Sequence, residues 1–205
     1  MVLRGAGINL EYYALQPYPR NEKVHFLYLG RIMQEKGMNE LFAAARRLYA
    51  ERQDFVLDLV GFFEEDYKMQ VEQLQAGGIA AFHGLEPRPF YYAADCVVLP
   101  SYHEGMSNVL LEAAAMGRPL ITSDIPGCRE AVENGVTGLL VPVKDSESLY
   151  LAMKQMLSMR AEERRQMGLA GHDKMEREFN KKHVVEATIQ ALGLQADAGE
   201  VLSCG

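Results

Sequence analysis

The feature that most constrains the fold is the regular alternation of short apolar runs with stretches of helical period. The runs are six or seven residues long and almost continuously apolar, without the polar alternation of a half-exposed strand. Such strands are typical of a parallel sheet that helices cover on both faces. We therefore predict a doubly wound, Rossmann-like α/β domain with a parallel sheet of about six strands. The predicted strands span residues 24–30, 55–61, 79–84, 96–101, 119–124 and 138–143.

The predicted helices fill the intervals between these strands and continue after the last one. The first helix is expected to be capped by the side chain of Asn39. Residues 146–159 have an amphipathic helical pattern, and the helical period continues over residues 162–192. The helices predicted between the strands span residues 38–52, 64–78, 89–95, 107–117 and 126–135.

The two ends of the chain depart from this alternation. Residues 1–20 have no clear period and contain two prolines near their end, so we interpret them as a linker. We expect a Rossmann-like domain over residues 21–160 and further helices over residues 161–193. Residues 194–205 are small and polar, and we expect a mobile tail there.

Composition limits the classes of partner and the compartment. The chain has 205 residues and a formal net charge of −7, which argues against binding nucleic acid or anionic membranes through a basic field. It leaves open a small anionic ligand held by a few local cations. The three cysteines, Cys96, Cys128 and Cys204, share no metal-like spacing, and Cys96 lies in an apolar run. We therefore expect a cytoplasmic protein in a reducing compartment.

The loop LGRIMQEKG, residues 29–37, is the first candidate ligand site. In doubly wound sheets, ligands bind in the loops at the carboxyl ends of the strands, and the same rule selects the loop that begins at Gly61. Gly30 allows a backbone to approach a ligand closely, while Arg31 and Lys36 supply two cations suited to a diphosphate. On this loop alone, a polar connection with solvated charges is the favoured alternative. The loop has neither the Walker nor the dinucleotide-binding glycine pattern.

The stretch HEGMSNVLLE, residues 103–112, is the second candidate. Glycine and serine precede an apolar helix, so we expect free backbone N–H groups near Ser107, Asn108 and Val109. These donors and the helix dipole favour a phosphate group.

Two glutamates flank this predicted anion site. Glu104 precedes the helix, and Glu112 lies one to two turns inside it. A carboxylate accepts hydrogen bonds and donates none, so it suits a vicinal diol better than a phosphate. The alternative is a solvated loop glutamate and a helix glutamate that favours the dipole, and the stretch alone does not separate the two readings. Together, the two loops supply cations for a diphosphate and carboxylates for hydroxyls. A nucleotide sugar carries both groups, and we predict it as the ligand.

These residues also resemble a known family. Two stretches are similar to the donor-binding, C-terminal half of family 4 glycosyltransferases, which have the GT-B fold. They are GRIMQEKG and, further along, ADCVVLPSYHEGMSNVLLEAAAMGRPLITSDIPGCREAVENGVTGLLVPVKD. The resemblance covers roughly residues 24–192, and its signature is two glutamates separated by seven residues, here Glu104 and Glu112. It implies transfer of a hexose-type sugar from a nucleotide sugar, with a UDP-sugar favoured and anomeric configuration retained. The implied acceptor is a glycan or lipid-linked molecule in bacterial capsular or other cell-surface polysaccharide synthesis.

The resemblance implies a role for each matching position. Arg31 and Lys36 would bind the donor diphosphate, Glu112 the ribose hydroxyls, and Glu104 the transferred sugar. Leu85 falls where the family holds the base. We predict Glu104, Arg31 and Lys36 as the catalytic residues. The other residues predicted to bind substrate are Gly30, Gly61, His103, Gly105, Met106, Ser107, Asn108 and Val109.

The resemblance also implies that no metal or other cofactor is needed. The chain agrees with this expectation, because it has no D-x-D triplet and its histidines have no ligand spacing. The histidines are His25, His83, His103, His172 and His183.

GT-B enzymes have a second doubly wound domain, which binds the acceptor. We expect residues 1–20 to be the hinge from that domain and residues 161–193 to pack back on it. The chain alone would then bind the donor weakly and transfer nothing, and the full-length enzyme would act in the cytoplasm, at the inner face of the membrane. Two alternatives stay open. One is a GT-B-like nucleotide-sugar epimerase, for which we identify no additional acid and base groups. The other is a non-catalytic module that binds nucleotide sugars.

Overall fold

A computed structural model describes residues 7–84 and 86–191. The strands are β1 (Val24–Leu29), β2 (Phe55–Val60), β3 (Ala80–His83), β4 (Cys96–Leu99), β5 (Leu120–Ser123) and β6 (Gly138–Val141). They form a six-stranded sheet in the order β3-β2-β1-β4-β5-β6, and all neighbouring strands are parallel. This is the strand order of the Rossmann fold, so the predicted architecture is confirmed.

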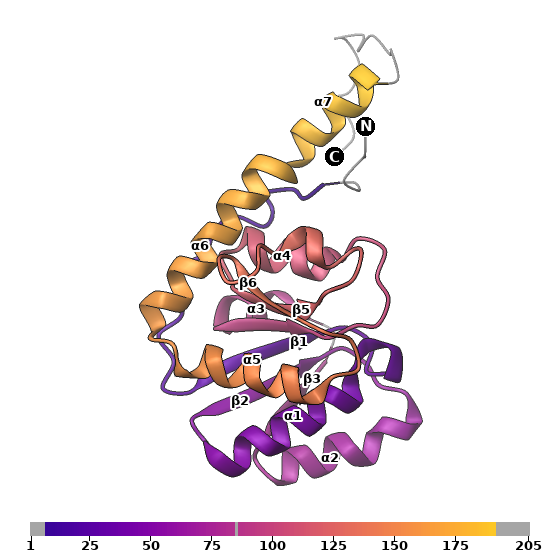
Figure 1. The fold of residues 1–205 in the computed structure, drawn as a ribbon, viewed down its shortest axis with the longest axis vertical. Coiled ribbons are helices and arrows are strands. Elements are labelled where there is room, and N and C mark those ends of the chain that lie inside the picture. The colour runs from indigo at the N-terminus through magenta and orange to yellow at the C-terminus, as the bar shows by residue number, and fades with distance from the viewer. Residues whose placement is uncertain (1–6, 85, 192–205) are drawn as a thin grey trace.

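Helices cover both faces of the sheet (Figure 1). One face carries α1 (Met38–Glu51), α2 (Lys68–Ala76) and α5 (Ser146–Ser158), and the other carries α3 (Arg88–Ala93), α4 (Asn108–Ala115) and α6 (Ala161–Glu178). The last helix, α7 (Lys181–Ala191), projects beyond the body of the domain. Short 3-10 helices occur at η1 (Gln34–Lys36), η2 (Glu65–Tyr67) and η3 (Arg129–Ala131).

The core explains why the strands are apolar along their whole length. Phe26, Leu57 and Val98 are fully buried, as expected for a sheet that is covered on both faces. Cys96 is also fully buried and free, which confirms its interpretation as a small apolar core residue.

The predicted cap of the first helix was wrong. Gly37 occupies the N-cap position of α1, and Asn39 lies inside the first turn. The chain turns at Gly37 after η1, so the helix begins earlier than the position of a polar cap suggested. The Asn39 side chain instead accepts a hydrogen bond from the Tyr67 hydroxyl (3.0 Å).

The helix predicted over residues 126–135 was also wrong, because only η3 is helical there. Pro126 has no N–H to donate, and the backbone is left-handed at Gly127 (φ 86°) and Gly135 (φ 78°). The helix predicted over residues 64–78 is present, but its first turn is the 3-10 helix η2.

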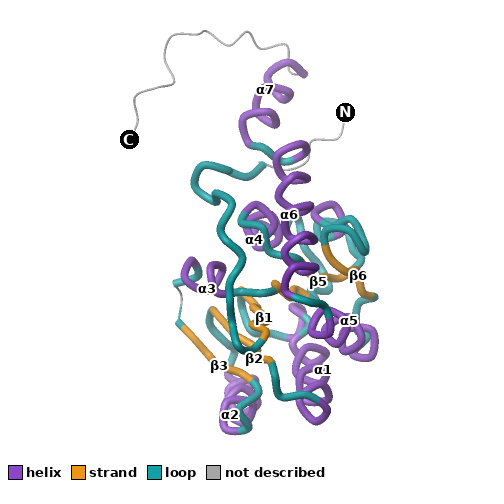
Figure 2. Tube along the Cα trace, turned by 90° about the vertical axis from the view of Figure 1, so that its left-hand side faces the viewer, coloured by secondary structure: helices purple, strands orange, loops and turns teal. Residues whose placement is uncertain are grey.

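The segment that precedes β1 runs along the domain, past α4 and α3 (Figure 2). Its Tyr18 is inserted into a cluster of buried charged side chains. The Tyr18 hydroxyl donates to the Asp95 backbone oxygen (2.8 Å) and accepts a hydrogen bond from Arg164 Nε (3.1 Å). Asp95 and Arg164 are buried, with 3.7 Å between the carboxylate and the guanidinium. The stretch predicted as a linker is therefore packed on the domain.

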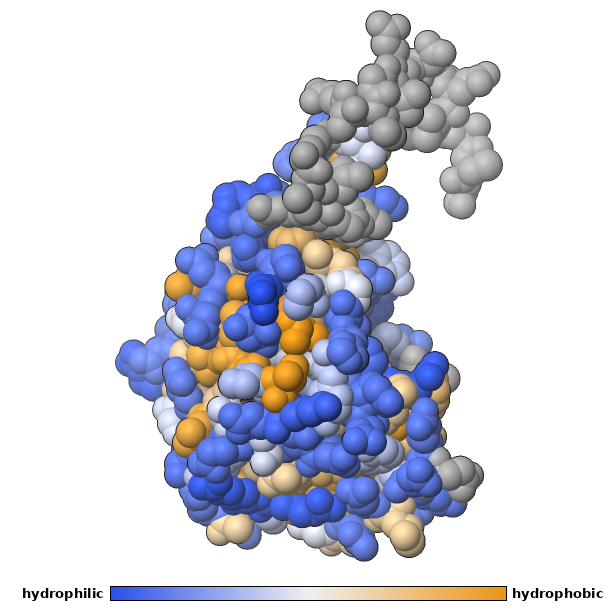
Figure 3. Space-filling view, turned by 45° about the vertical axis from the view of Figure 1, so that its right-hand side comes forward, coloured by the Kyte–Doolittle hydropathy of each residue, from blue (hydrophilic) through white to orange (hydrophobic). Residues whose placement is uncertain are grey.

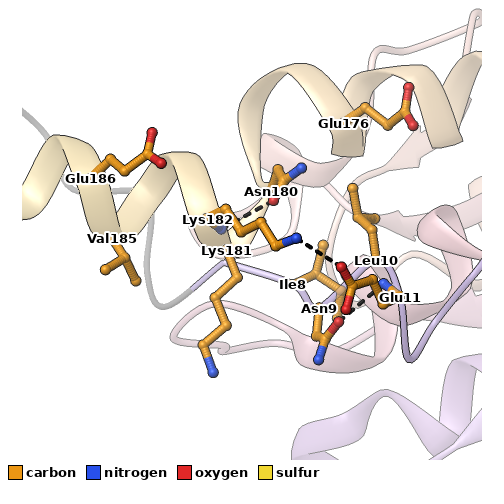
Figure 4. A pocket seen from close by; sticks show the side chains of 10 residues that line it. All are labelled: Ile8, Asn9, Leu10, Glu11, Glu176, Asn180, Lys181, Lys182, Val185 and Glu186. Atoms are coloured by element: carbon orange, nitrogen blue, oxygen red, sulfur yellow. Dashed lines mark hydrogen bonds and ion pairs between the residues drawn. The ribbon is translucent and has the colours of Figure 1, made fainter. Parts of the chain in front are cut away.

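The start of this segment forms a cavity of about 550 Å³ with the junction of α6 and α7 (Figure 4). The Ile8 N–H donates to the Phe179 carbonyl (2.7 Å), and the Ile8 carbonyl accepts from the Lys181 N–H (3.0 Å). Lys182 Nζ lies 2.7 Å from Glu11 Oε1. The predicted linker and the predicted C-terminal helices thus contact each other.

A carboxylate on β2 joins two histidines of the neighbouring strands. Asp58 lies 2.7 Å from His25 Nδ1 and 2.8 Å from His83 Nε2. The hydrogen bond to Asp58 raises the pKa of His25 above its usual value, and this effect outweighs the opposing effect of burial. The His83 ring also packs on Phe90 of α3, with 4.2 Å between the ring centroids. The three polar side chains therefore tie β1, β2 and β3 together across the sheet.

The raised pKa of His25 predicts a pH-dependent contribution to stability. A histidine whose pKa is higher in the folded state stabilises that state fully below its unfolded pKa of about 6.5. The contribution is lost as the pH rises through the folded value. We expect His25→Gln to lower the free energy of unfolding more at about pH 6 than at about pH 8.

Urea unfolding of both proteins at the two pH values measures this difference. His183→Gln is the matched control, because His183 is exposed on α7. An equal loss for His25→Gln at both pH values would contradict the prediction.

Candidate functional site

The loop after β1 and the loop after β4 meet at the carboxyl edge of the sheet, because β1 and β4 are neighbours in the order of the strands. They enclose a cavity of about 590 Å³. Figure 3 brings forward the side of the molecule on which these loops lie, and it shows apolar surface bordered by hydrophilic side chains. The predicted site residues that line the cavity are Gly30, Arg31, Lys36, Glu104, Met106, Ser107, Asn108 and Val109.

The other predicted residues lie outside this cavity wall or outside the described chain. Gly61, His103, Gly105 and Glu112 do not line it, although the first three belong to loops at the same edge. Leu85 lies outside the described residues. The sequence analysis did not single out four residues of the wall, which are Leu29, Met33, Phe62 and Leu99.

Lys36 and Glu104 form an ion pair across the cavity. Lys36 Nζ lies 2.6 Å from Glu104 Oε1, and the two side chains are 27% and 15% exposed. From the sequence we predicted that the two residues bind different groups of the ligand, so their direct contact is a new observation. Because a lysine ammonium has three donors, Lys36 can keep this contact and still bind a phosphate oxygen. The pair also makes the wall of the cavity less charged than its residue types suggest.

Arg31 is held against an aromatic ring at the edge of the cavity. Its guanidinium carbon lies 5.4 Å from the centroid of the Phe62 ring, within the range of a cation–π contact. Phe62 is 51% exposed, and it follows Gly61 directly at the end of β2. The position of Phe62 in the loop at the end of a strand could have identified it as a residue of the cavity wall. Its aromatic face favours one orientation of the Arg31 side chain.

The start of α4 supplies backbone donors at the cavity. The hydrogen bond from Leu111 N–H to Ser107 O (3.2 Å) opens the helix. The N–H groups of Asn108 and Val109 come before it, and both residues line the cavity. The expectation of a free Ser107 N–H was wrong, because it donates to the Gly127 carbonyl (3.0 Å). The positive end of the helix dipole still favours an anion at this position.

The segment after β5 packs against the loop between β4 and α4. Gly127 has a left-handed backbone (φ 86°), and a Cβ atom there would collide with the carbonyl oxygens of Gly105 and Glu104. The Gly127 N–H donates to Glu130 Oε2 (2.7 Å), which fixes the turn. Gly127 therefore lets the two loops approach more closely than any side chain would permit. The sequence showed this glycine only as part of a family-like segment.

Glu112 lies in the second turn of α4, where it is held by tyrosines. The Tyr91 hydroxyl on α3 donates to Glu112 Oε2 (2.9 Å), and Tyr91 is buried. Burial, together with interaction with the Glu112 carboxylate, raises the pKa of Tyr13 to about 12. Neither tyrosine was among the residues predicted to bind substrate. Their contacts with Glu112 depend on segments far apart in the chain.

The described part of the chain has no candidate metal cluster and no helix that could span a membrane. Within residues 7–84 and 86–191, His, Cys, Asp and Glu side chains form no group of three that could hold a metal ion. Over the same residues, no helix is both long enough and apolar enough to cross a membrane.

Two relatives with curated names match most of the chain. A glycogen synthase of Mycobacterium tuberculosis is 34% identical over 188 residues, which cover 89% of this chain and 45% of that protein. The capsular polysaccharide biosynthesis glycosyltransferase CapM of Staphylococcus aureus is 26% identical over 195 residues, which cover 88% of this chain and 50% of CapM. The chain thus spans about half the length of the curated relatives it matches.

The fold is a Rossmann-like domain with a cavity at the carboxyl edge of its sheet. A similar fold occurs in HepE of Anabaena, in the complex with UDP, with a TM-score of 0.79 and 18% identity over 91% of this chain and 56% of that chain. Residues 23–159 match the family described as glycosyl transferases group 1. The chain belongs to this glycosyltransferase family.

The close approach at Gly127 predicts a specific cost of adding a side chain there. Alanine in a left-handed conformation costs about 1–2 kcal/mol, and at Gly127 the collision with the Gly105 carbonyl adds to this cost. We expect Gly127→Ala to lower the free energy of unfolding clearly more than Gly135→Ala does.

Urea unfolding of both variants tests this prediction. Gly135 is a matched control, because its φ of 78° is similar and no atom lies within 4 Å of the position its Cβ would take. Equal losses in the two variants would show that the collision is relieved at no cost.

Proposed function

We propose that the chain is the donor-binding part of a family 4, retaining glycosyltransferase of the GT-B type. The proposal rests on one observation: cations, helix N–H donors and a carboxylate surround a single cavity at the carboxyl edge of the sheet. A nucleotide sugar has a diphosphate for the cations and hydroxyls for the carboxylates. We favour a UDP-sugar with a hexose-type sugar as the donor.

In this proposal, the diphosphate lies between the β1–α1 loop and the start of α4. Arg31 offers a planar pair of donors to phosphate oxygens, and Lys36 offers a compact charge. The N–H groups of Asn108 and Val109 add neutral donors and the positive end of the helix dipole. These groups suit the leaving nucleoside diphosphate, because it gains negative charge when the bond to the sugar breaks.

Glu104 then acts on the sugar. As the bond between the anomeric carbon and the phosphate oxygen breaks, the sugar gains positive charge, which a nearby carboxylate stabilises. The acceptor oxygen attacks the face that the phosphate leaves, and its proton passes to that phosphate, so the anomeric configuration is retained. Glu104 is not a nucleophile in this scheme. Its ion pair with Lys36 supports the proposal, because it links the sugar carboxylate to a diphosphate cation (2.6 Å).

The relatives support the choice of donor and of process. HepE of Anabaena is known in complex with UDP, and CapM is a glycosyltransferase of capsular polysaccharide biosynthesis. We therefore propose a glycan or lipid-linked acceptor in cell-surface polysaccharide synthesis, in the cytoplasm at the inner face of the membrane. Acceptor binding would need a second domain of the complete enzyme, and we propose no metal or other cofactor.

Binding of UDP to the chain tests the proposal directly. A ligand that binds only the folded state stabilises it, so UDP at about 100 times its Kd would raise the thermal midpoint by roughly 5–10 °C. We expect Lys36→Ala and Glu112→Gln to reduce this shift by about half or more, because each removes a charged contact with the nucleotide.

Lys23→Ala and Glu72→Gln are the matched controls, since both residues are exposed and neither lines the cavity. They are expected to keep the shift of the wild type. An equal shift in the wild type and in both site variants would locate UDP elsewhere and contradict the proposal. No shift with UDP, GDP or ADP, alone or as their sugars, would instead favour a module that does not bind nucleotide sugars.

A further inference from the structure

The two glutamates of the site are held in different ways. Glu104 is paired with the cation of Lys36 (2.6 Å), whereas Glu112 has no cationic partner among the described residues. Its carboxylate instead receives a hydrogen bond from the Tyr91 hydroxyl (2.9 Å), and the neutral Tyr13 hydroxyl is close enough for the two groups to interact. Neutral donors orient a carboxylate without neutralising its charge. The Glu112 carboxylate therefore has lone pairs left that can accept further hydrogen bonds from a ligand.

Both tyrosines are fixed on rigid parts of the fold. Tyr91 is 1% exposed on α3, between that helix and α4. Tyr13 belongs to the segment before β1, and its ring packs edge-on against Tyr12, with 4.9 Å between the centroids. The Arg88 guanidinium of α3 lies 3.8 Å from the centroid of the Tyr12 ring, which anchors this segment beside the same helix. Two donors therefore reach Glu112 from separate segments.

The protonation of the two phenols agrees with this role. Burial and the nearby Glu112 charge raise the pKa of Tyr91 above its usual value. Burial and the same carboxylate raise the pKa of Tyr13 to about 12. Both hydroxyls consequently stay protonated at neutral pH and act as donors to the carboxylate.

We propose that Tyr91 and Tyr13 are positioning residues that hold the Glu112 carboxylate toward the ribose hydroxyls of the donor nucleotide. This inference rests on the proposed function. A carboxylate has about four lone-pair sites, so two tyrosine donors leave room for two ribose hydroxyls. With its orientation fixed before the ligand arrives, Glu112 loses little conformational freedom on binding.

Calorimetric titration of the chain with UDP and with 2′,3′-dideoxy-UDP tests the inference. The second ligand lacks both ribose hydroxyls, so it cannot make the proposed contact with Glu112. A variant that weakens its binding must therefore act in some other way. We expect Tyr91→Phe and Tyr13→Phe each to weaken UDP binding about three- to tenfold, the usual effect of one hydrogen bond. Binding of the dideoxy ligand is expected to stay unchanged. In a Glu112→Gln background, the tyrosine changes should add little, since they act through the same group.

Two neighbouring tyrosines serve as matched controls. Tyr92 follows Tyr91 on α3 and is 44% exposed, and Tyr12 precedes Tyr13 and is 58% exposed. Tyr92→Phe and Tyr12→Phe remove the same hydroxyl group from the same segments, and they should bind both ligands like the wild type.

The possible outcomes separate the inference from the proposed function. If Tyr91→Phe and Tyr13→Phe weaken both ligands equally, the tyrosines only stabilise the fold, and the inference is overturned. The inference is also overturned if Glu112→Gln weakens UDP binding but the tyrosine variants do not. In that case the proposed function still stands. If the wild type fails to bind UDP, or binds it independently of Glu112, the proposed function fails, and the inference fails with it.

Discussion

The site depends on the pairing of β1 with β4. Phe26 pairs with Cys96 and Leu27 with Val97, in parallel, although about 70 residues separate the two strands in the chain. The strand order reverses direction at this pair, so the loops that leave β1 and β4 diverge to opposite faces and leave a crevice between them. Arg31 and Lys36 enter it from one loop, and Glu104 and the start of α4 from the other. Without this one pairing, the charged groups would belong to separate surfaces.

The arrangement of charges around the crevice explains how an acidic protein can hold an anion. The cations are few but local, and they are joined by uncharged donors at the start of α4. Glu104 is paired with Lys36, whereas Glu112 accepts a hydrogen bond from the neutral Tyr91 hydroxyl. The net charge of −7 is therefore a poor guide to the field inside the cavity. Short-range pairing decides which groups a ligand meets.

The sequence predicted the sheet and most of the cavity wall, because both follow from local patterns. Six continuous apolar runs define buried parallel strands, and residues in strand-end loops such as Arg31 and Glu104 must then meet at one edge. Contacts between distant segments left no such pattern. The ion pair of Lys36 with Glu104 and the hydrogen bond of Tyr91 to Glu112 need the tertiary structure to become visible. The predicted cap at Asn39 was wrong for a related reason. Asparagine is a good capping residue, but the turn at Gly37, two residues earlier, already begins α1.

The insertion of Tyr18 among buried charges bears on where this folding unit starts. Pattern alone would begin the domain at β1, yet Tyr18 supplies a hydrogen bond to Arg164, and the neighbouring Pro17 carbonyl accepts one from the fully buried Arg118 (2.8 Å). Removing this segment would take away both partners and uncover two guanidinium groups that are buried in the intact chain. A version of the domain cut at the first strand would therefore carry two arginines with missing partners. The packed domain is therefore longer than its sheet, and it includes the segment that carries Tyr13 and Tyr18.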